Sequence, residues 1–159
     1  MEITDILDAK FVISDLNASS KKHALQALST EAAKLTGLTE RQIFDVLLER
    51  EKLGSTGVGQ GIAIPHGRMS ELSRIHGIFA RLNKPIEFDS VDGERVDLIF
   101  LLLAPESAGA DHLKALAKVS RLFRNKKACA QMRQSPGGEH LFDIIAGREH
   151  SPTSLASAK

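Results

Sequence analysis

The chain has 159 residues, of which 42% are hydrophobic and 26% charged, so it is long enough to bury a core and too apolar to remain disordered. A net charge of +1 and only 4% aromatic residues argue against nucleic-acid binding, because they supply neither a basic stripe nor a stacking platform for bases. The single cysteine, Cys129, excludes an intrachain disulfide and a zinc site of several cysteines. The acidic N-terminus and the shortness of the apolar run 98–104 predict neither a signal peptide nor membrane insertion, so we expect a cytoplasmic protein.

The first third of the chain predicts one strand followed by two helices. Alternating apolar residues predict the strand at 11–16. Ser19 or Ser20 then caps a helix whose apolar stripe ends at Gly37. The run Thr39-Glu40-Arg41-Gln42 is typical of a capping box, in which the threonine and glutamine side chains bond each other's backbone, so a second helix is expected from 39 to about 53.

The remainder predicts further strands and then helices. Strands are expected at 62–64, at 75–82 and at 98–104, the last so uniformly apolar that it should be buried on both faces. Asp92-Gly93 marks a turn between short extended pieces. Helical spacing resumes after Pro105 and continues in short helices at 126–133 and 139–145. These elements predict one α/β domain over residues 1–147, with a mixed sheet of about five strands, helices on both faces, and a flexible tail at 148–159.

The glycine-rich segment GSTGVGQGIAIPHG, residues 54–67, is the main candidate for chemistry. A helix precedes its glycines and a strand follows them, the reverse of a dinucleotide-binding fold, and no Lys-Ser or Lys-Thr completes a P-loop. His66 is expected just beyond a strand end, where Pro65 fixes the backbone and Gly67 leaves room for a bulky group or a partner protein. A neutral imidazole is nucleophilic towards phosphorus near pH 7, so His66 is a candidate nucleophile; the alternative is a histidine that only caps a turn.

The stretch EKLGSTGVGQGIAIPHG, residues 51–67, resembles the phosphorylation-site signature of the mannitol/fructose-type enzyme IIA proteins of the bacterial phosphotransferase system. Within that family it is most similar to the nitrogen-regulatory branch. The similarity continues through PIEFDSVDGERVDLIFLLLAP and extends from about residue 3 to residue 145. This resemblance implies that His66 accepts a phosphoryl group on its tele nitrogen from an HPr-like carrier, which is charged in turn by an enzyme I that uses phosphoenolpyruvate.

Arg50 is a second candidate site residue. Its helical spacing from Val46 and Leu47 places it on the inward side of its helix. From the residues alone, Arg50 either complements the negative end of the helix or holds phosphate oxygens with its guanidinium. The resemblance favours the phosphate role, because the family has an arginine at the matching place.

His112, near the start of the helix after Pro105, is the third candidate. It is either a partly buried histidine bonded to backbone or a donor to a phosphoryl group beside the positive helix end. The resemblance favours a second active-site histidine that stabilises the phosphoryl group without being phosphorylated. The backbone amides of residues 55–59 are further candidate donors. No metal or nucleotide cofactor is expected, because no acidic or cysteine ligand stands at the spacing that a His66–His112 metal site needs.

Three functions remain open at this point. The first is a regulatory phosphocarrier whose phosphorylation state alters its binding to targets such as potassium-transport or kinase proteins. The second is an EIIA component that feeds a fructose or mannitol permease, and the third is a binding module without phosphotransfer. The signature, and the lack of a fused IIB or IIC domain, favour the regulatory phosphocarrier.

Overall fold

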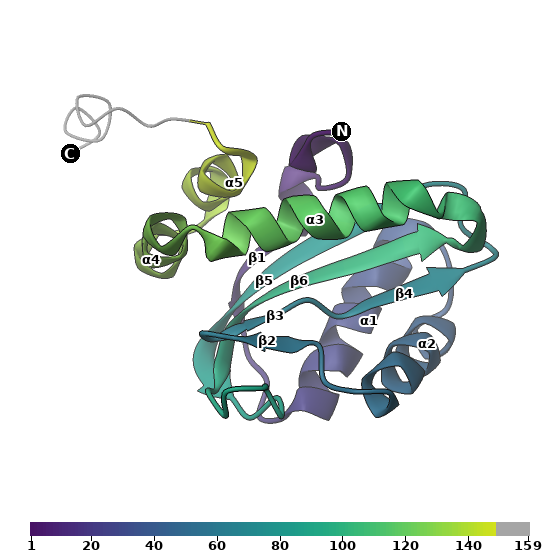
Figure 1. Ribbon diagram of the computed structural model, residues 1–159, viewed down its shortest axis with the longest axis horizontal. Helices are drawn as coiled ribbons and strands as arrows, with labels where there is room; N and C mark the ends of the chain where they lie inside the picture. The colour runs from purple at the N-terminus through teal and green to yellow at the C-terminus, as the bar shows by residue number, and fades with distance from the viewer. Residues whose placement is uncertain (149–159) are drawn as a thin grey trace.

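Residues 1–148 are described by a computed structural model, in which a six-stranded mixed sheet carries helices on both faces (Figure 1). The strands are β1 (Val12–Leu16), β2 (Gly57–Gly59), β3 (Ile62–Ala63), β4 (His66–Met69), β5 (His76–Ile86) and β6 (Val96–Pro105). The helices are α1 (Lys21–Thr36), α2 (Glu40–Lys52), α3 (Ala110–Arg124), α4 (Lys126–Gln134) and α5 (Gly138–Ala146), with short 3-10 turns at Ile3–Asp5, Ala9–Phe11 and Glu106–Ala108. The predicted fold class is confirmed, whereas the predicted tail, apart from Arg148, lies outside the described residues.

The sheet is organised around β6. Its strand order is β1-β5-β6-β3-β2, with β4 also paired to β6. On one side β6 runs antiparallel to β5; on the other it runs parallel first to β3 and then to β4, so that Ile62 lies opposite Leu98 and His66 opposite Leu102. Pro65 separates β3 from β4, because a residue without an N–H interrupts the ladder.

The prediction that β6 is buried on both faces is confirmed. Ile99, Leu101 and Leu103 pack in a cluster with residues of α1 and α2, whereas Leu98, Phe100 and Leu102 pack in a second cluster with residues of α3, α4 and α5. Burial of each such side chain contributes about 1.5–3 kcal/mol, so the alternating pattern fixes which face each helix covers. Figure 1 shows α3 crossing one face of the sheet while α1 and α2 lie behind the other.

The predicted helix signals determine where α1 and α2 begin and end. The Ser20 hydroxyl accepts from the amide of His23 at 3.1 Å, and α1 ends at Gly37, whose φ of 80° is left-handed. Thr39 and Gln42 form the predicted reciprocal capping box, at 3.1 Å and 3.0 Å. Because this box fixes the start of α2, it also fixes which side chains its last turn directs at β4.

Two strands were not predicted, β2 and β4. β6 extends to Pro105, past the end of β3, and its backbone pairs with residues 66–69 to form β4. The prediction that His66 lies just beyond the sheet is therefore wrong, since His66 is the first residue of β4. The first strand also begins one residue later than expected, because Phe11 closes a 3-10 turn.

Candidate functional site

A groove of about 490 Å³ crosses the sheet at β4, between the C-terminal end of α2 and the N-terminal end of α3. The two helices lie on opposite faces of the sheet, so the groove is lined from both faces at once. It brings together all three predicted site residues. The lining consists of Val46, Glu49, Arg50, Leu53, His66, Gly67, Arg68, His112, Leu113 and Leu116.

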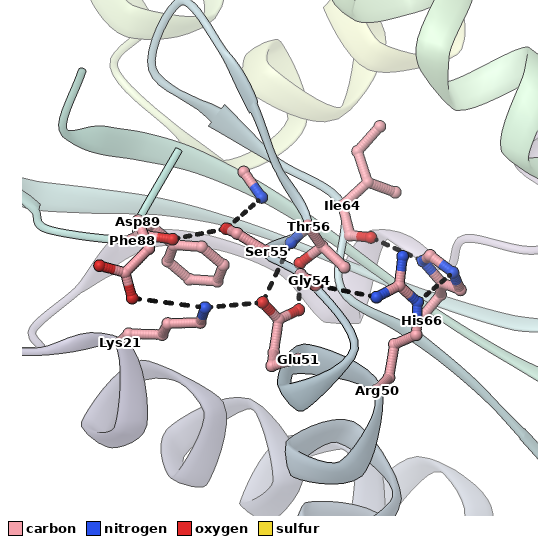
Figure 2. Close-up of polar contacts among 11 residues, drawn as sticks. Lys21, Arg50, Glu51, Gly54, Ser55, Thr56, Ile64, His66, Phe88 and Asp89 are labelled. Atoms are coloured by element: carbon pink, nitrogen blue, oxygen red, sulfur yellow. Dashed lines mark hydrogen bonds and ion pairs between the residues drawn. The ribbon is translucent and has the colours of Figure 1, made fainter. Parts of the chain in front are cut away.

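The hydrogen bonds of His66 define its tautomer. Its Nδ1 lies 2.9 Å from the carbonyl oxygen of Ile64, which can only accept, so Nδ1 carries the proton. Nε2 therefore holds the lone pair and accepts from Nε of Arg50 at 3.2 Å (Figure 2). This arrangement makes Nε2, which faces the guanidinium, the nucleophilic atom of the ring.

The surroundings of His66 also keep the ring neutral. Burial lowers the pKa of His66 from its ordinary value of 6.5, and the positive charges of Arg50 and Arg68 lower it further. The hydrogen bond to Ile64 and the carboxylate of Glu51 act in the opposite direction, but the net change is downward. At pH 7 the imidazole is therefore unprotonated at Nε2 and able to attack an electrophile.

Arg50 is held at two points. Besides the bond to His66, its Nη1 donates to the carbonyl oxygen of Gly54 at 2.9 Å (Figure 2). The side chain is partly buried in the last turn of α2, on the side that faces β4, as its spacing predicts. A planar guanidinium fixed in this way presents its remaining N–H groups to any anion bound at Nε2.

His112 approaches His66 from the other face of the sheet. It is only 3% exposed and belongs to the first turn of α3, and its ring centroid lies 5.7 Å from that of His66. Within residues 1–148 its Nδ1 has no hydrogen-bond partner, so the alternative of a backbone-bonded histidine is not supported at this atom. Burial, followed by the charges of Arg68 and His66, lowers the pKa of His112, and its ring is neutral at pH 7.

Gly67 and the amides of residues 55–59 make contacts that bear on the roles expected of them. A Cβ on Gly67 would lie 2.5 Å from Cγ1 of Val46, so the missing side chain lets α2 approach the sheet. Gly67 also lines the groove, and the room that it was expected to leave for a partner stays a prediction. The amide of Thr56 donates to the carboxylate of Glu51 at 3.0 Å, and the amide of Gly57 donates to the hydroxyl of Ser55 at 3.0 Å. These two amides are already bonded and are not available to a phosphoryl group, whereas a phosphate role for the amides of Ser55, Val58 and Gly59 stays a prediction.

The sequence reasoning missed Arg68 and Glu51. Arg68 follows His66 by two positions in β4, so strand alternation places both side chains on one face, and both line the groove. That alternation was the available signal, but it is meaningful only once residues 66–69 are known to be a strand. For Glu51 the signal was an acidic residue in the last turn of α2, where the negative helix end disfavours it.

Residues 1–148 contain neither a candidate metal cluster nor a candidate membrane-spanning helix. In that part of the chain no group of three or more His, Cys, Asp or Glu side chains is arranged to hold a metal ion. Among the same residues, no helix is long and apolar enough to span a membrane.

Comparison with known proteins identifies the family of this chain. The family described as "Phosphoenolpyruvate-dependent sugar phosphotransferase system, EIIA 2" matches residues 5–147, and the chain belongs to this family. The resemblance seen in residues 51–67 is thereby confirmed. A phosphotransfer role within this system follows from membership.

Named relatives indicate a branch within the family. A "Nitrogen regulatory protein" from Bradyrhizobium diazoefficiens is 52% identical over 146 residues, which cover 92% of this chain and 95% of the relative. The crystal structure of the "Nitrogen Regulatory Protein IIA-Ntr" from Neisseria meningitidis superimposes with a TM-score of 0.86 at 36% identity, covering 90% of this chain and 98% of that one. A "PTS system fructose-specific EIIA component" from Haloferax volcanii is 30% identical over 150 residues, covering 92% and 97%.

Proposed function

We propose that the chain accepts a phosphoryl group on Nε2 of His66 from the phosphohistidine of an HPr-like carrier, and that its phosphorylation state regulates its binding to other proteins. The observation that supports this most directly is the pair of hydrogen bonds on His66. Ile64 holds the proton at Nδ1, and Arg50 contacts the lone pair of Nε2 inside an accessible groove. A ring fixed in this tautomer is ready to attack without a separate base.

The transfer step exchanges one N–P bond for another. The lone pair of Nε2 attacks phosphorus while the N–P bond of the donor breaks and returns its electron pair to the donor's imidazole. The His66 ring gains positive charge as the new bond forms, and the Ile64 carbonyl that accepts from Nδ1 stabilises it. Because similar bonds are made and broken, the driving force is small and the protein has mainly to orient the groups.

Three side chains in the groove are proposed to stabilise the oxygens of the phosphoryl group. Arg50 loses its contact with Nε2 when that atom forms the N–P bond, and its Nε–H then becomes free to bind a phosphoryl oxygen. His112 brings an imidazole whose Nδ1 is unpartnered within the described chain, and Arg68 brings a second guanidinium. Donors of this kind stabilise the charge that develops in transfer.

The regulatory role is proposed from the named relatives. The nitrogen regulatory protein is 52% identical and the fructose-specific component 30%, so the first is the better guide to this chain. We therefore expect the phosphate to act as a signal in the cytoplasm, with targets such as potassium-transport or kinase proteins. The second candidate, delivery of the phosphoryl group to a sugar permease, is favoured by the fructose-specific relative. Transfer of label to a fructose-type IIB protein would distinguish the two.

The proposal is tested by labelling with ³²P-phosphoenolpyruvate, enzyme I and an HPr-like carrier. The parent protein is expected to acquire acid-labile label, and ³¹P NMR should place the phosphorus on Nε2. His66→Ala should acquire none, whereas His23→Ala, which alters an exposed histidine of α1, should label like the parent. If His66→Ala is labelled as fully as the parent, the proposal is wrong.

A further inference from the structure

Glu51 is a buried carboxylate that the proposed transfer step does not use. It is 8% exposed and lies in the last turn of α2, where the negative helix end disfavours an acid. Its ion-pair partner, Lys21, is the first residue of α1, where the positive helix end disfavours a cation. Both charges therefore stand at the unfavourable ends of their helices, so their own helices do not explain them. A buried ion pair is also weak evidence for stability by itself.

The carboxylate of Glu51 is instead the centre of a hydrogen-bonded network. It lies 2.8 Å from Nζ of Lys21, accepts from the amide of Thr56 at 3.0 Å, and also accepts from the hydroxyl of Thr56 (Figure 2). Lys21 in turn lies 4.9 Å above the ring of Phe88. With every oxygen satisfied, Glu51 fixes the position of the turn that begins after α2.

A second tether holds the same turn. The hydroxyl of Ser55 donates to the carbonyl of Phe88 at 2.6 Å and accepts from the amide of Gly57 at 3.0 Å. Residues on both sides of the Ser55–Thr56 peptide are thus anchored, one to Glu51 and one to Phe88 (Figure 2). The turn therefore behaves as a rigid piece of backbone and not as a loose connection.

The rigid turn ends at the atom that orients Arg50. The carbonyl of Gly54, directly before Ser55, accepts from Nη1 of Arg50, while Nε of the same guanidinium contacts His66. An arginine side chain has several rotatable bonds, so its direction depends on what its far end meets. The Gly54 contact does not involve Nε2 of His66, so phosphorylation of that atom does not remove the acceptor.

We infer that Glu51, held by Lys21 and Thr56, is a positioning residue for Arg50 and keeps its guanidinium beside Nε2 before and after phosphorylation. This inference rests on the proposed function only for its consequence on transfer. The orientation of Arg50 in the unphosphorylated protein is independent of it. Glu51 acts entirely through the turn and does not contact the phosphoryl group.

The test compares Glu51→Gln with Asp45→Asn, which neutralises an exposed carboxylate of the same helix. Asp45 lies 3.9 Å from Arg41 in an ion pair and is not part of the Glu51 network. Glu51→Gln is expected to slow single-turnover transfer about tenfold, because a misplaced group lowers the rate of the chemical step. The carrier concentration that gives half of the maximal rate should not change. The bond to His66 is expected to shift the Arg50 Nε–H resonance in the parent, and in Glu51→Gln this resonance should move to the position of a free arginine. Asp45→Asn should leave both readouts unchanged.

A double-variant cycle separates positioning from general damage. In an Arg50→Ala background, Glu51→Gln should produce no further slowing, because its effect passes through Arg50. If the two effects multiply, or if the Arg50 Nε–H resonance is unchanged in Glu51→Gln, the inference is wrong. If Glu51→Gln fails to fold, the same measurements are made on Thr56→Val and Lys21→Met, which each remove one contact to Glu51. Lys21→Arg keeps the positive charge and is expected to retain the parent rate.

Failure of the proposed function gives a different pattern. In that case the parent itself acquires no label on His66, while the Arg50 resonance still reports whether Glu51 positions the guanidinium. If the parent is labelled but the Glu51 and Thr56 variants transfer normally, only the positioning role is overturned.

Discussion

The two helices that flank His66 differ in how their polar groups are hydrogen-bonded. On the α2 side, Arg50 donates from both Nε and Nη1, and both oxygens of Glu51 are bonded. On the α3 side, His112 is buried beside His66, and its Nδ1 has no partner anywhere in residues 1–148. In the unphosphorylated protein the α2 flank therefore uses Nε and Nη1 of Arg50 and both oxygens of Glu51 in hydrogen bonds, whereas the α3 flank leaves the buried Nδ1 of His112 without one.

This contrast shows how the site divides stability and function. A satisfied network holds its groups in place, so removing one member leaves others unpaired and weakens both the fold and the chemistry. An unpaired buried nitrogen costs the folded state about 1–3 kcal/mol, so removing it should strengthen the fold while weakening the chemistry. The same kind of substitution is expected to have opposite effects on stability on the two flanks.

The largest effect is expected from Arg50→Ala. This substitution removes a charged donor to the phosphoryl oxygens and should slow single-turnover transfer by about 10²–10³-fold. It should also lower the free energy of unfolding by about 1 kcal/mol, since the α2 side of the groove loses two hydrogen bonds. Rapid-quench labelling and urea unfolding measure the two quantities.

The control for Arg50→Ala is Arg41→Ala, an exposed arginine of the same helix. It should transfer at the parent rate. Arg50→Lys keeps the charge but not the fork of N–H groups, and should recover only part of the activity. Transfer by Arg50→Ala at the rate of Arg41→Ala would show that the guanidinium has no part in the reaction.

A smaller effect on rate, with the opposite effect on stability, is expected from His112→Leu. Loss of a neutral donor should slow transfer about tenfold, less than loss of a charged one. Removal of the unpartnered Nδ1 should raise the free energy of unfolding by about 1 kcal/mol, measured by urea unfolding. Val119→Ala, a truncation of a core residue on the same helix, should destabilise the protein without slowing transfer. A His112→Leu protein less stable than the parent would remove the contrast between the flanks.

Much of the α2 flank was predictable because its signals are local. The Thr39–Gln42 box fixes the start of α2, and from that start the helical period alone directs Arg50 towards the sheet. His66 and its neighbours were recognisable as a signature, and the apolar run of β6 identified the central strand. In each case a few consecutive residues contain the whole signal.

The remaining features depend on contacts that no local pattern encodes. β4 forms only because β6 extends beyond β3, so neither the strand nor the position of Arg68 was visible in residues 66–69 alone. The close approach of Val46 explains Gly67, but that contact joins α2 to a strand that was not predicted. Lys21 and Glu51 likewise meet only after α1 and α2 have packed side by side.

The smallest effects are expected from the positive charge of Arg68, which acts on the histidines of both flanks. Arg68 lowers the pKa of both His66 and His112, whereas Arg50 lowers that of His66 alone. Arg68→Gln should therefore raise both pKa values in an NMR titration of the ring protons. Arg50→Gln should raise that of His66 through loss of a direct charge, and should act on the pKa of His112 only indirectly, through the charge of His66.

The same shifts fix the sign of the pH dependence of stability. Both histidines have folded-state pKa values below the ordinary 6.5, so below that pH the unfolded chain binds protons that the folded chain does not. The free energy of unfolding should fall as the pH drops from 6.5 to the folded pKa values, and should not depend on these two groups above 6.5. Because Arg68→Gln brings the folded values closer to 6.5, it should flatten this decline, as urea unfolding across the range will measure. If Arg68→Gln changes the pKa of only one of the two histidines, its guanidinium acts on one side of the groove and does not link the two sides electrostatically.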